Sequence, residues 1–463
     1  MNPNTVSFWH ETVDLTQPRP ALAGPVDVDV AIIGGGFCGL STALYLKRAQ
    51  PGLRVAVLEQ RVCGYGASGR NGGFAMTLFG LTMEILKLRF GATAVREAQD
   101  FMEAAVDHVG TLVREEGVEC DYHHGGLLTV ATSKGGARRL QNETRLANRL
   151  GIAGIHYLSA AETRRRVNSA TYLGARVEDN CATLNPAKLS RELLRLAEAA
   201  GAEIYEETPV TAVRVGPPGG PVLLRTPRGR VRARKLLFAT NAYGIQFPQL
   251  RAKQVPVGTY IVLTEPLTPA QLGPIGWANR EGIEDSPNFV HYYRLTAHNR
   301  LLMGGGDVTV PTGTNLPPDH APGIFRHLEE HLKLTFPSLR DATITHRWGG
   351  PVSVTVDMAP AFGWLGRDDR RVAYALGCVG HGVAMMSYSG QLLRDLLLER
   401  KTALTDLFFV NRTTIPWPPE PLRMLAGAAI HGYMYLEDGA ARRQVAQNAD
   451  GAGSGQVVGA PVG

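Results

Sequence analysis

The sequence predicts an α/β fold in which a Rossmann-type nucleotide-binding domain is interleaved with a second domain built on an antiparallel sheet. Three observations predict this fold. An apolar run, a glycine cluster and a helical pattern follow one another in DVDVAIIGGGFCGLSTALYLKRA, residues 27–49. Runs of alternating apolar and polar residues, broken by turns, occupy residues 254–311. Segments that resemble parts of a nucleotide-binding domain lie on both sides of that block.

The composition is that of a folded chain with more than one core. The chain has 463 residues, of which 44% are hydrophobic and 19% are charged. A chain of this length exceeds what a single core usually serves, so we expect about two domains. The 48 basic and 42 acidic residues are spread along the chain without a nucleic-acid recognition motif. We therefore expect no nucleic-acid partner.

The sequence also lacks the features of an exported or membrane-spanning protein. The first residues, MNPNTVSFWHETVDL, are not a basic segment followed by an apolar one. The most apolar later window, residues 372–388, is interrupted by three glycines and His381, so we predict no membrane span. The five cysteines form no CxxC pair and no zinc-type spacing. We expect free thiols, no metal site and a cytoplasmic location.

The first elements predict one βαβ unit of a parallel sheet. Residues 28–33 read as a buried strand, residues 40–49 as a helix and residues 53–59 as a second strand. A glycine-rich loop follows at residues 63–74, and a long helical region then extends to about Gly117. After it we expect β-like pieces at residues 125–132 and a charged helix near 136–150.

The later elements return the chain to the nucleotide-binding domain. Residues 185–215 read as an amphipathic helix, a stop at Gly201 and two strands, and a further strand is expected within 231–244. The predicted division is a nucleotide-binding domain at 1–85, 151–245 and 339–438, and a substrate domain at 86–150 and 246–338. The remaining residues, 439–463, are rich in glycine and alanine, so we expect a flexible tail.

Gly34, Gly36 and Gly39 match the GxGxxG motif of dinucleotide-binding turns. The first glycine permits the tight turn, the second lets a pyrophosphate approach the backbone, and the third lets helix and strand pack closely. Glu59 ends the next predicted strand, 20 residues after Gly39. An acid there accepts hydrogen bonds from ribose hydroxyls and repels a 2′-phosphate, so NADP is the least favoured dinucleotide.

A second glycine-rich loop, residues 66–73, follows Glu59 almost at once. A plain NAD dehydrogenase is expected to continue the alternation of strands and helices at this point. A glycine-rich excursion suits a longer cofactor that lies across several loops, which favours FAD over NAD.

Four stretches carry a resemblance to a known family: DVAIIGGGFCGLSTALYLKR, LEQ, GYGASGRNGG and LGCVGHGVAMMSYSGQLLRDLL. They resemble the FAD-dependent D-amino-acid oxidase superfamily, in the branch of glycine and sarcosine oxidases and γ-glutamylputrescine oxidase, across residues 8–420. The resemblance implies a Rossmann-type, GR2-like FAD-binding domain. The residues that it implies for cofactor binding are Gly34, Gly36, Phe37, Cys38, Gly39, Glu59, Gln60, Ala67, Ser68, Gly69, Arg70, Asn71, Gly72, Gly73, Val210, Gly380, His381, Gly382 and Val383.

The last of these residues also have an argument of their own. Gly380, His381 and Gly382 open an apolar helix, so its first N–H groups face whatever lies in front of it. Reduced flavin carries negative charge at its pyrimidine end, for which a helix N-terminus is a suitable partner. His381 would add a hydrogen bond or a positive charge. The alternative is that His381 only starts the helix and lies away from the flavin.

The resemblance implies oxidation of the CH–NH bond of an amine or amino acid to an imine, with O₂ as acceptor and H₂O₂ as product. An amine dehydrogenase that passes electrons to a quinone or carrier protein is the first alternative, and a non-redox flavin-binding protein is the second. Cys63 and Cys378 match no flavin-linkage motif, so we expect noncovalent FAD. The oxygen-activating lysine of sarcosine-oxidase relatives has no clear counterpart here, Lys253 being the nearest.

Substrate contacts are expected from the antiparallel block, with Tyr260, Tyr292 and Arg294 as catalytic or substrate-binding candidates beside His381. Along a strand Tyr292 and Arg294 share one face, and His291 and Tyr293 share the other. Arg294 would hold a substrate carboxylate or serve as a salt-bridge partner.

Two further residues are left open. Trp348 is expected to pack near the cofactor or in the core. Asp357, followed by Pro360, is expected to order a turn rather than to act in catalysis.

Overall fold

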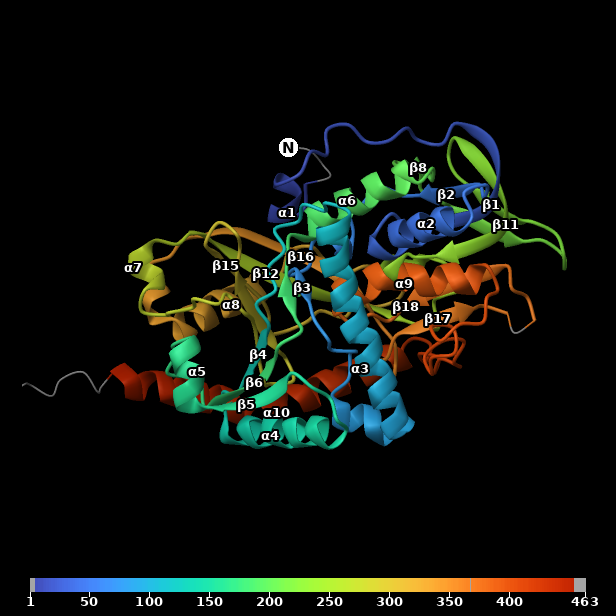
Figure 1. Cartoon of the computed structure of the whole chain (residues 1–463). Coiled ribbons are helices and arrows are strands. Elements are labelled where there is room, and N and C mark those ends of the chain that lie inside the picture. Colours follow the sequence, from blue (N-terminus) through green and yellow to red (C-terminus); the bar gives the residue numbers. More distant parts are fainter. Residues whose placement is uncertain (1–4, 367, 454–463) are drawn as a thin grey trace, which may run out of the picture.

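The computed structural model describes residues 5–366 and 368–453, and it contains two large sheets, each of eight strands, that lie next to each other (Figure 1). The first sheet carries the βαβ unit predicted at residues 28–59, and the second is the predicted antiparallel sheet. The predicted fold class is therefore confirmed.

The first sheet has a parallel centre. Its main path runs β17-β18-β11-β1-β2-β8, and every neighbouring pair from β18 to β8 is parallel. The antiparallel strand β17 closes one edge, and the hairpin strands β9 and β10 extend from β11. The bounds are β1 Gly24–Ile33, β2 Val55–Leu58, β8 Glu203–Tyr205, β9 Ala212–Val215, β10 Val222–Arg225, β11 Gly229–Phe238, β17 Ala361–Trp364 and β18 Val372–Leu376.

Four helices cover one face of the parallel sheet: α2 (Phe37–Ala49), α3 (Met83–Glu115), α6 (Pro186–Ala199) and α9 (Gly382–Leu397). Alternate residues of the central strands point into this helical core, as Ile32 of β1 does. Their neighbours, such as Ile33, point to the other face, where they pack with β10 and the chain around Leu250. Both faces of the parallel strands are therefore buried, which explains their continuous apolar sequences.

Helices α2 and α9 pack against each other at very short range. The Ser41 hydroxyl of α2 donates a hydrogen bond to the carbonyl oxygen of Ser387 in α9. Gly390 of α9 faces the same turn of α2, and a Cβ on this residue would lie 2.5 Å from the carbonyl carbon of Ser41. The absence of a side chain at Gly390 thus fixes how closely the two helices approach.

The second sheet is mostly antiparallel and has the order β16-β12-β15-β14-β13-β4-β6-β5, in which only the pair β13–β4 is parallel. Helix α8 (Pro322–Thr335) packs on one face through Phe325, Leu328 and Leu332. The bounds of the strands are β4 Leu127–Val130, β5 Ile155–Ser159, β6 Gly174–Glu178, β12 Val255–Pro266, β13 Gly282–Asp285, β14 His291–Leu295, β15 Arg300–Gly305 and β16 Ile344–Val354.

Short elements connect the two sheets, and local sequence signals start several helices. Ser133 caps α4 (Lys134–Arg149) by accepting a hydrogen bond from the N–H of Gly136, and Asn185 caps α6 in the same way from Lys188. The remaining elements are α1 Phe8–Glu11, η1 Ala67–Gly69, β3 Phe74–Ala75, α5 Ala160–Arg166, β7 Ala182–Thr183, η2 Asn241–Gln246, α7 Pro269–Leu272, η3 Pro337–Leu339 and α10 Leu422–Gly453.

The structure differs from the predicted division of the chain at two boundaries. Strands β5 and β6 belong to the second sheet, although residues 151–245 were assigned to the nucleotide-binding domain. Strand β16 pairs with β12 along its length, although residues 339–438 were assigned to that domain as well. Both differences arise from long-range strand pairing, which no local sequence pattern encodes.

The tail predicted from residue 439 also differs. Helix α10 extends from Leu422 to Gly453, so residues 439–453 are helical, and residues 454–463 lie outside the described residues. The alanine that lowers the complexity of this segment is also the strongest helix former. The helix lies below the second sheet in Figure 1.

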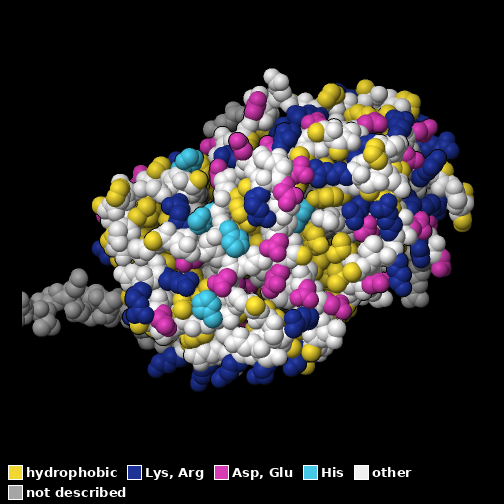
Figure 2. All heavy atoms as spheres, viewed as in Figure 1, with side chains coloured by type: hydrophobic (Ala, Val, Ile, Leu, Met, Phe, Trp, Pro, Cys, Tyr) yellow, Lys and Arg dark blue, Asp and Glu magenta, His cyan; other side chains and the backbone are white. Residues whose placement is uncertain are grey.

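The surface carries mixed charge. On the face shown in Figure 2, Lys and Arg side chains are interspersed with Asp and Glu side chains. Over residues 5–366 and 368–453, every helix is too short or too polar to cross a membrane.

The approach of α2 and α9 leads to a stability prediction. Gly390→Ala places a methyl group against the backbone of Ser41, and we expect it to lower the free energy of unfolding by about 1–3 kcal/mol, the usual cost of overpacking. Gly432→Ala in α10, where a Cβ would meet nothing within 4 Å, is the matched control. It should be neutral or stabilising by up to about 1 kcal/mol, because alanine favours a helix over glycine. Chemical denaturation measures both, and equal effects would contradict the prediction.

Candidate functional site

Two helix N-termini meet at one edge of the parallel sheet. Strands β1 and β18 both pair in parallel with β11, so their carboxyl ends lie at the same edge, and α2 and α9 begin directly after them. The N-cap residues, Gly36 for α2 and His381 for α9, provide no side-chain hydrogen bond to the first turn. Uncapped helix N-termini at the carboxyl edge of a parallel sheet form the usual binding place for phosphate and other anions.

The glycines of the predicted turn fit their expected roles. Gly34 has a φ of +110°, and a Cβ there would lie 2.5 Å from the carbonyl oxygen of Ala239. A Cβ on Gly39 would overlap the carbonyl oxygen of Gly34. Gly36 lies against Ser68, whose hydroxyl accepts a hydrogen bond of 3.0 Å from the N–H of Phe37. The strand, the turn and the helix can therefore pack only with glycine at these positions.

Glu59 follows β2 at the same edge of the sheet. Its carboxylate accepts hydrogen bonds from the N–H groups of Gly35 at 2.7 Å and Arg61 at 2.9 Å. Burial raises the pKa of this carboxyl group. The acid thus lies beside the first glycine turn, where the adenosine ribose of a dinucleotide is expected.

The other residues predicted near the turn occupy different environments. Phe37 and Cys38 are buried in the first turn of α2, and burial raises the pKa of the Cys38 thiol to about 12. Gln60 is exposed. Val210 packs against the core of the parallel sheet. All five cysteines are buried and free, as expected.

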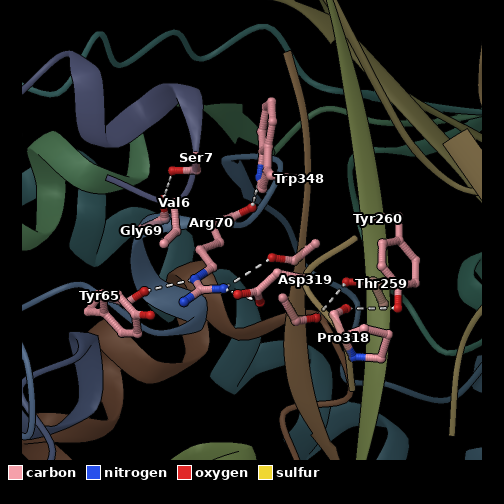
Figure 3. A network of polar contacts seen from close by, with 12 residues as sticks. Val6, Ser7, Tyr65, Gly69, Arg70, Thr259, Tyr260, Pro318, Asp319 and Trp348 are labelled. Atoms are coloured by element: carbon pink, nitrogen blue, oxygen red, sulfur yellow. Dashed lines mark hydrogen bonds and ion pairs between the residues drawn. The ribbon is translucent and has the colours of Figure 1, made fainter. Parts of the chain in front are cut away.

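The predicted glycine-rich loop after Glu59, taken from here on as residues 64–73, is held in place by side chains that donate hydrogen bonds to its carbonyl oxygens. The hydroxyl of Ser7, at the N-cap of α1, donates to the carbonyl oxygen of Gly69 at 2.7 Å. The indole N–H of Trp348, in β16, donates to the carbonyl oxygen of Arg70 at 2.8 Å. Figure 3 shows both contacts, Ser7 with Gly69 and Trp348 with Arg70.

Two further donors bind the next two carbonyl groups of this loop. The indole N–H of Trp9 donates to the carbonyl oxygen of Asn71 at 2.9 Å. Arg294, in β14, donates from Nε to that of Gly72 at 2.7 Å and from Nη2 to that of Leu184 at 2.6 Å. The Arg294 guanidinium also lies over the Trp9 ring, 5.1 Å from its centroid.

Arg70 joins the glycine-rich loop to the second sheet. Its side chain is almost fully buried, and its Nη1 donates to Asp319 at 2.6 Å and to the carbonyl oxygen of Gly349 at 3.3 Å. Its Nε donates to the carbonyl oxygen of Tyr65 at 2.9 Å, and the guanidinium lies over the Tyr65 ring (Figure 3). Arg70 was predicted as a cofactor contact, and its observed contacts are within the protein.

The direction of these hydrogen bonds determines what the loop offers on its other side. In a trans peptide the carbonyl and the N–H groups point in opposite directions. Because the carbonyl groups of Arg70 and Asn71 point towards Trp348 and Trp9, the N–H groups of Asn71 and Gly72 point away from these anchors. The Asn71 side chain accepts a hydrogen bond from the N–H of Gly73 at 2.8 Å, which closes the turn. The loop therefore presents backbone donors to a bound ligand.

The alternation predicted along β14 is confirmed. Tyr292 and Arg294 lie on the face turned towards the glycine-rich loop: Arg294 binds that loop, and a Cβ on Gly72 would lie 2.9 Å from the Tyr292 ring. His291 and Tyr293 lie on the opposite face, which is covered by α8.

Tyr260 lies on the face opposite to Tyr292, which differs from its predicted role. Its ring is buried against Phe325 of α8, and its hydroxyl donates to the carbonyl oxygen of Pro318 at 3.0 Å (Figure 3). The residue before it, Thr259, hydrogen-bonds the hydroxyl of Tyr292. Sequence reasoning chose the aromatic residue, whereas the alternation of β12 puts Thr259 on the face of Tyr292.

His381 presents an orphaned polar atom in front of α9. Its Nδ1 is buried and has no hydrogen-bond partner among the described residues. Burial lowers the pKa of His381 to about 4, so the ring is neutral near pH 7. Gly380 has a φ of +89°, and a Cβ there would meet nothing within 4 Å. A polar ligand group in front of α9 would satisfy His381, which fits the pyrimidine end of a flavin.

Three more predictions can be compared with the structure. Trp348 is buried in a small apolar cluster, which confirms its placement in the core, and its indole N–H also binds the glycine-rich loop. Its placement near the cofactor stays a prediction. Asp357 is paired with Arg412, and it accepts a hydrogen bond from the N–H of Ala359, which confirms that it orders a turn. Lys253 donates to Thr414 at 2.9 Å and lies over the ring of Tyr374.

Sequence reasoning missed the anchors of the loop. Ser7 and Trp9 lie before residue 28, where the first predicted strand begins, and Asp319 lies in a loop. The SFWH stretch at residues 7–10, with a helix-capping serine before two aromatic residues, was the one available signal of an ordered element. Its contact with residues 64–73 spans too much sequence to be seen locally.

Comparison with known proteins agrees with this geometry. The sequence matches the model of the FAD dependent oxidoreductase family (DAO) over residues 29–396. It is 31% identical to gamma-glutamylputrescine oxidoreductase of Escherichia coli K12, over 90% of this chain and 94% of that protein. It is 25% identical to glycine oxidase of Bacillus licheniformis, over 83% of this chain and 97% of that protein.

Solved structures share the fold. Glycine oxidase from Geobacillus kaustophilus matches with a TM-score of 0.70 and 22% identity, over 84% of this chain and 99% of that chain. L-proline dehydrogenase from P. horikoshii matches with a TM-score of 0.69 and 20% identity, over 83% of this chain and 96% of that chain.

The resemblance noted in the sequence is thus confirmed, and the cofactor of the family is FAD. The two uncapped helix N-termini, the glycine turn with Glu59 and the orphaned His381 nitrogen fit such a cofactor. The protein is an oxidoreductase, and its chain belongs to the DAO family of FAD-dependent oxidoreductases.

Proposed function

We propose that this oxidoreductase oxidises the CH–NH bond of an amine or amino acid to an imine, which water hydrolyses to a carbonyl compound and ammonia or an amine. FAD, when bound, takes up the two electrons that leave the substrate carbon. We propose O₂ as the final acceptor, reduced by these electrons and two protons to H₂O₂. The names of three relatives, gamma-glutamylputrescine oxidoreductase, glycine oxidase and L-proline dehydrogenase, support an amine or amino-acid substrate.

The observation that carries this proposal is the position of Tyr292. Its ring lies against Gly72 of the glycine-rich loop, and its hydroxyl is hydrogen-bonded to Thr259 on the same face of the second sheet. Burial raises the pKa of Tyr292, so the hydroxyl stays protonated and can donate or accept a hydrogen bond. Tyr292 and Thr259 would orient a substrate between the second sheet and the cofactor.

The chemistry requires orientation and desolvation more than a strong base. Once the amine is neutral, its carbon can lose a hydride equivalent directly, and an apolar surrounding favours the neutral amine. His381 is itself neutral near pH 7 because of burial. It would act as a hydrogen-bonding partner at α9 rather than as a permanent cation.

Arg294 has a structural role whatever the substrate is. Two of its nitrogens bind the carbonyl groups of Gly72 and Leu184, and burial lowers the pKa of its guanidinium to about 9. We infer that it positions the glycine-rich loop. Recognition of a substrate carboxylate remains a second proposed role, for which its Nη1 edge would be used.

The proposed reaction is tested first by anaerobic reduction of the flavin. We expect one class of amines or amino acids to bleach the visible flavin band, and admitted air to restore it rapidly with formation of H₂O₂. Rapid return of the visible flavin absorption in air identifies an oxidase. Bleaching with slow return in air would contradict the O₂ step and favour a dehydrogenase that uses a quinone or carrier protein. If no compound of a broad amine panel bleached the flavin, the amine proposal would be abandoned.

The two tyrosines of the second sheet provide a matched pair of variants. Tyr292→Phe removes a hydroxyl from the proposed substrate face, and we expect kcat/KM to fall about tenfold, the value of one hydrogen bond of about 1.4 kcal/mol. Tyr260→Phe removes a hydroxyl from the opposite face and should leave kcat/KM within about twofold, since small effects there reflect packing alone. Steady-state kinetics with the amine found above measures both, and a larger loss in Tyr260→Phe would refute the assignment of faces.

Because Trp9 helps to hold the glycine-rich loop in place, we expect its loss to weaken the binding of FAD. Trp9→Phe removes the N–H donor to Asn71 and keeps a ring beneath Arg294. We expect the Kd of FAD to rise up to about tenfold, because one hydrogen bond is worth about 1 kcal/mol. Trp277→Phe is the control, since the Trp277 indole N–H donates to the Glu281 carbonyl oxygen in the core of the second sheet. Flavin fluorescence on dilution measures the release, and equal release by the two variants would contradict this role for Trp9.

A further inference from the structure

Four side chains with metal-ligating chemistry gather on the face of the second sheet that is opposite to Tyr292. Asp285 ends β13 and His291 begins β14, and their side chains are 1% and 5% exposed. His327 and His331 face them from α8 and are half-buried. The reaction proposed above uses none of these groups.

Asp285 holds the imidazole of His291 in one orientation. One carboxylate oxygen accepts the backbone N–H of His291, and the other lies 2.7 Å from its Nδ1. The Nε2 of His291 then points towards the Nε2 of His327, at 3.2 Å. A carboxylate behind one imidazole nitrogen, with the other nitrogen directed at a shared point, is the usual arrangement around a metal-ligating histidine.

The distance between the two Nε2 atoms also suits a shared ion. Two nitrogens at about 2.0–2.1 Å from one Zn²⁺ in tetrahedral geometry are separated by about 3.4 Å. Gly306 leaves room beside this pair, because a Cβ there would lie 2.6 Å from the His291 Nε2. The geometry therefore requires little rearrangement of either ring.

His331 supplies a third imidazole from the next turn of α8. Residues four positions apart lie on the same side of a helix, so His327 and His331 reach the sheet together. The His331 ring stacks on His291 with 3.6 Å between centroids, and its Nε2 lies 3.6 Å from Asp285. One ligand atom from each of Asp285, His291 and His331 lies within 4.8 Å of the others.

The charge of the cluster favours a cation. Asp285 is buried, and the carboxylate of Asp438, in α10, is also buried and lies close enough to interact with it. Asp438 is itself fixed by the N–H groups of Asn288 and Phe289, in the β13–β14 connection. A divalent ion would balance the negative charge of both acids.

We propose that Asp285, His291, His327 and His331 form the binding site of one divalent transition-metal ion of the Zn²⁺ and Co²⁺ class, with Asp285 also orienting His291 and with the His331 ring turned out of its stack on His291. Imidazole nitrogens are the ligands that this class of ions prefers. The ion would join α8 to β14 and hence brace the side of the second sheet on which α10 packs. It would act on stability rather than on the reaction, because the cluster and Tyr292 lie on opposite faces.

Cysteine spacing had predicted no metal site. The proposed ligands contain no cysteine and come from three separate elements, so their assembly is not visible in the sequence. The stretch HLEEH, residues 327–331, is the one local signal, because it places two histidines one helical turn apart. Many helices carry such a pair of histidines without binding a metal. The contact of this pair with His291 and Asp285, which the sequence does not reveal, is what indicates a metal site.

The test uses the untagged, FAD-loaded protein after treatment with a chelator. We expect calorimetric titration with Zn²⁺ to give one ion per chain, and Co²⁺ to produce the visible absorption of a tetrahedral nitrogen-rich site. His327→Gln and His331→Gln should each weaken Zn²⁺ binding at least tenfold. His298→Gln, at an exposed position in the turn between β14 and β15, is the matched control and should bind Zn²⁺ as the unmodified protein does.

Thermal unfolding distinguishes a variant that has lost a metal ligand from one that has lost folding stability. Without metal the variants at 327 and 331 should melt close to the unmodified protein, and added Zn²⁺ should raise the melting temperature of the unmodified protein alone. Binding should also weaken as the pH falls, because protonated imidazole is not a ligand. Absence of stoichiometric binding, or equal binding by the unmodified protein, His327→Gln and His331→Gln, would overturn the proposal. The amine test is independent of this outcome.

Discussion

The fixed direction of the carbonyl groups in the glycine-rich loop is the constraint on which the site depends. Residues 64–73 contain too little side chain to form a core of their own, so their conformation is set by donors from elsewhere: Ser7 and Trp9 in the N-terminal segment, Arg294 in β14 and Trp348 in β16. Each of these hydrogen bonds is worth about 1 kcal/mol. Together they leave the N–H groups of Asn71 and Gly72 pointing away from Trp348 and Trp9, on the side where we propose that the cofactor lies. Arg70 ties the loop to Asp319 and to Gly349 of the second sheet.

The same constraint explains why the two sheets form one working unit. The parallel sheet brings the N-termini of α2 and α9 to one edge, and the close contact between Ser41 and Gly390 sets the distance between these helices. The second sheet contributes a face with Tyr292 and Thr259, and the Tyr292 ring lies against Gly72 of the glycine-rich loop. The residues proposed to bind the cofactor and those proposed to orient the substrate thus meet at the glycine-rich loop. The opposite face, with its histidines, is built around α8 instead.

Sequence patterns predicted what short segments determine. The βαβ unit, the GxGxxG turn, Glu59 and the helix after His381 each follow from residues that are close in sequence, and the structure contains all four. The face of Tyr260, the anchoring by Trp9 and the place of β5 and β6 depend on partners far away in the chain, which periodicity cannot identify. The helix at 439–453 was missed for another reason, because low complexity was read as disorder although alanine favours a helix.

The strand order of the first sheet has a consequence for how the protein matures. β11 lies between β1 and β18, so the parallel sheet combines an early, a middle and a late part of the chain. Its contacts are therefore of high sequence separation, which slows folding. The glycine turn at Gly34 is synthesised early, whereas α9 is synthesised late. Until α9 is complete, the helix start that would receive the flavin ring is missing. With the cofactor placed at both helix starts, as we propose, the complete site would form only after α9 has been synthesised, and a chain that ends before α9 would contain only the glycine turn.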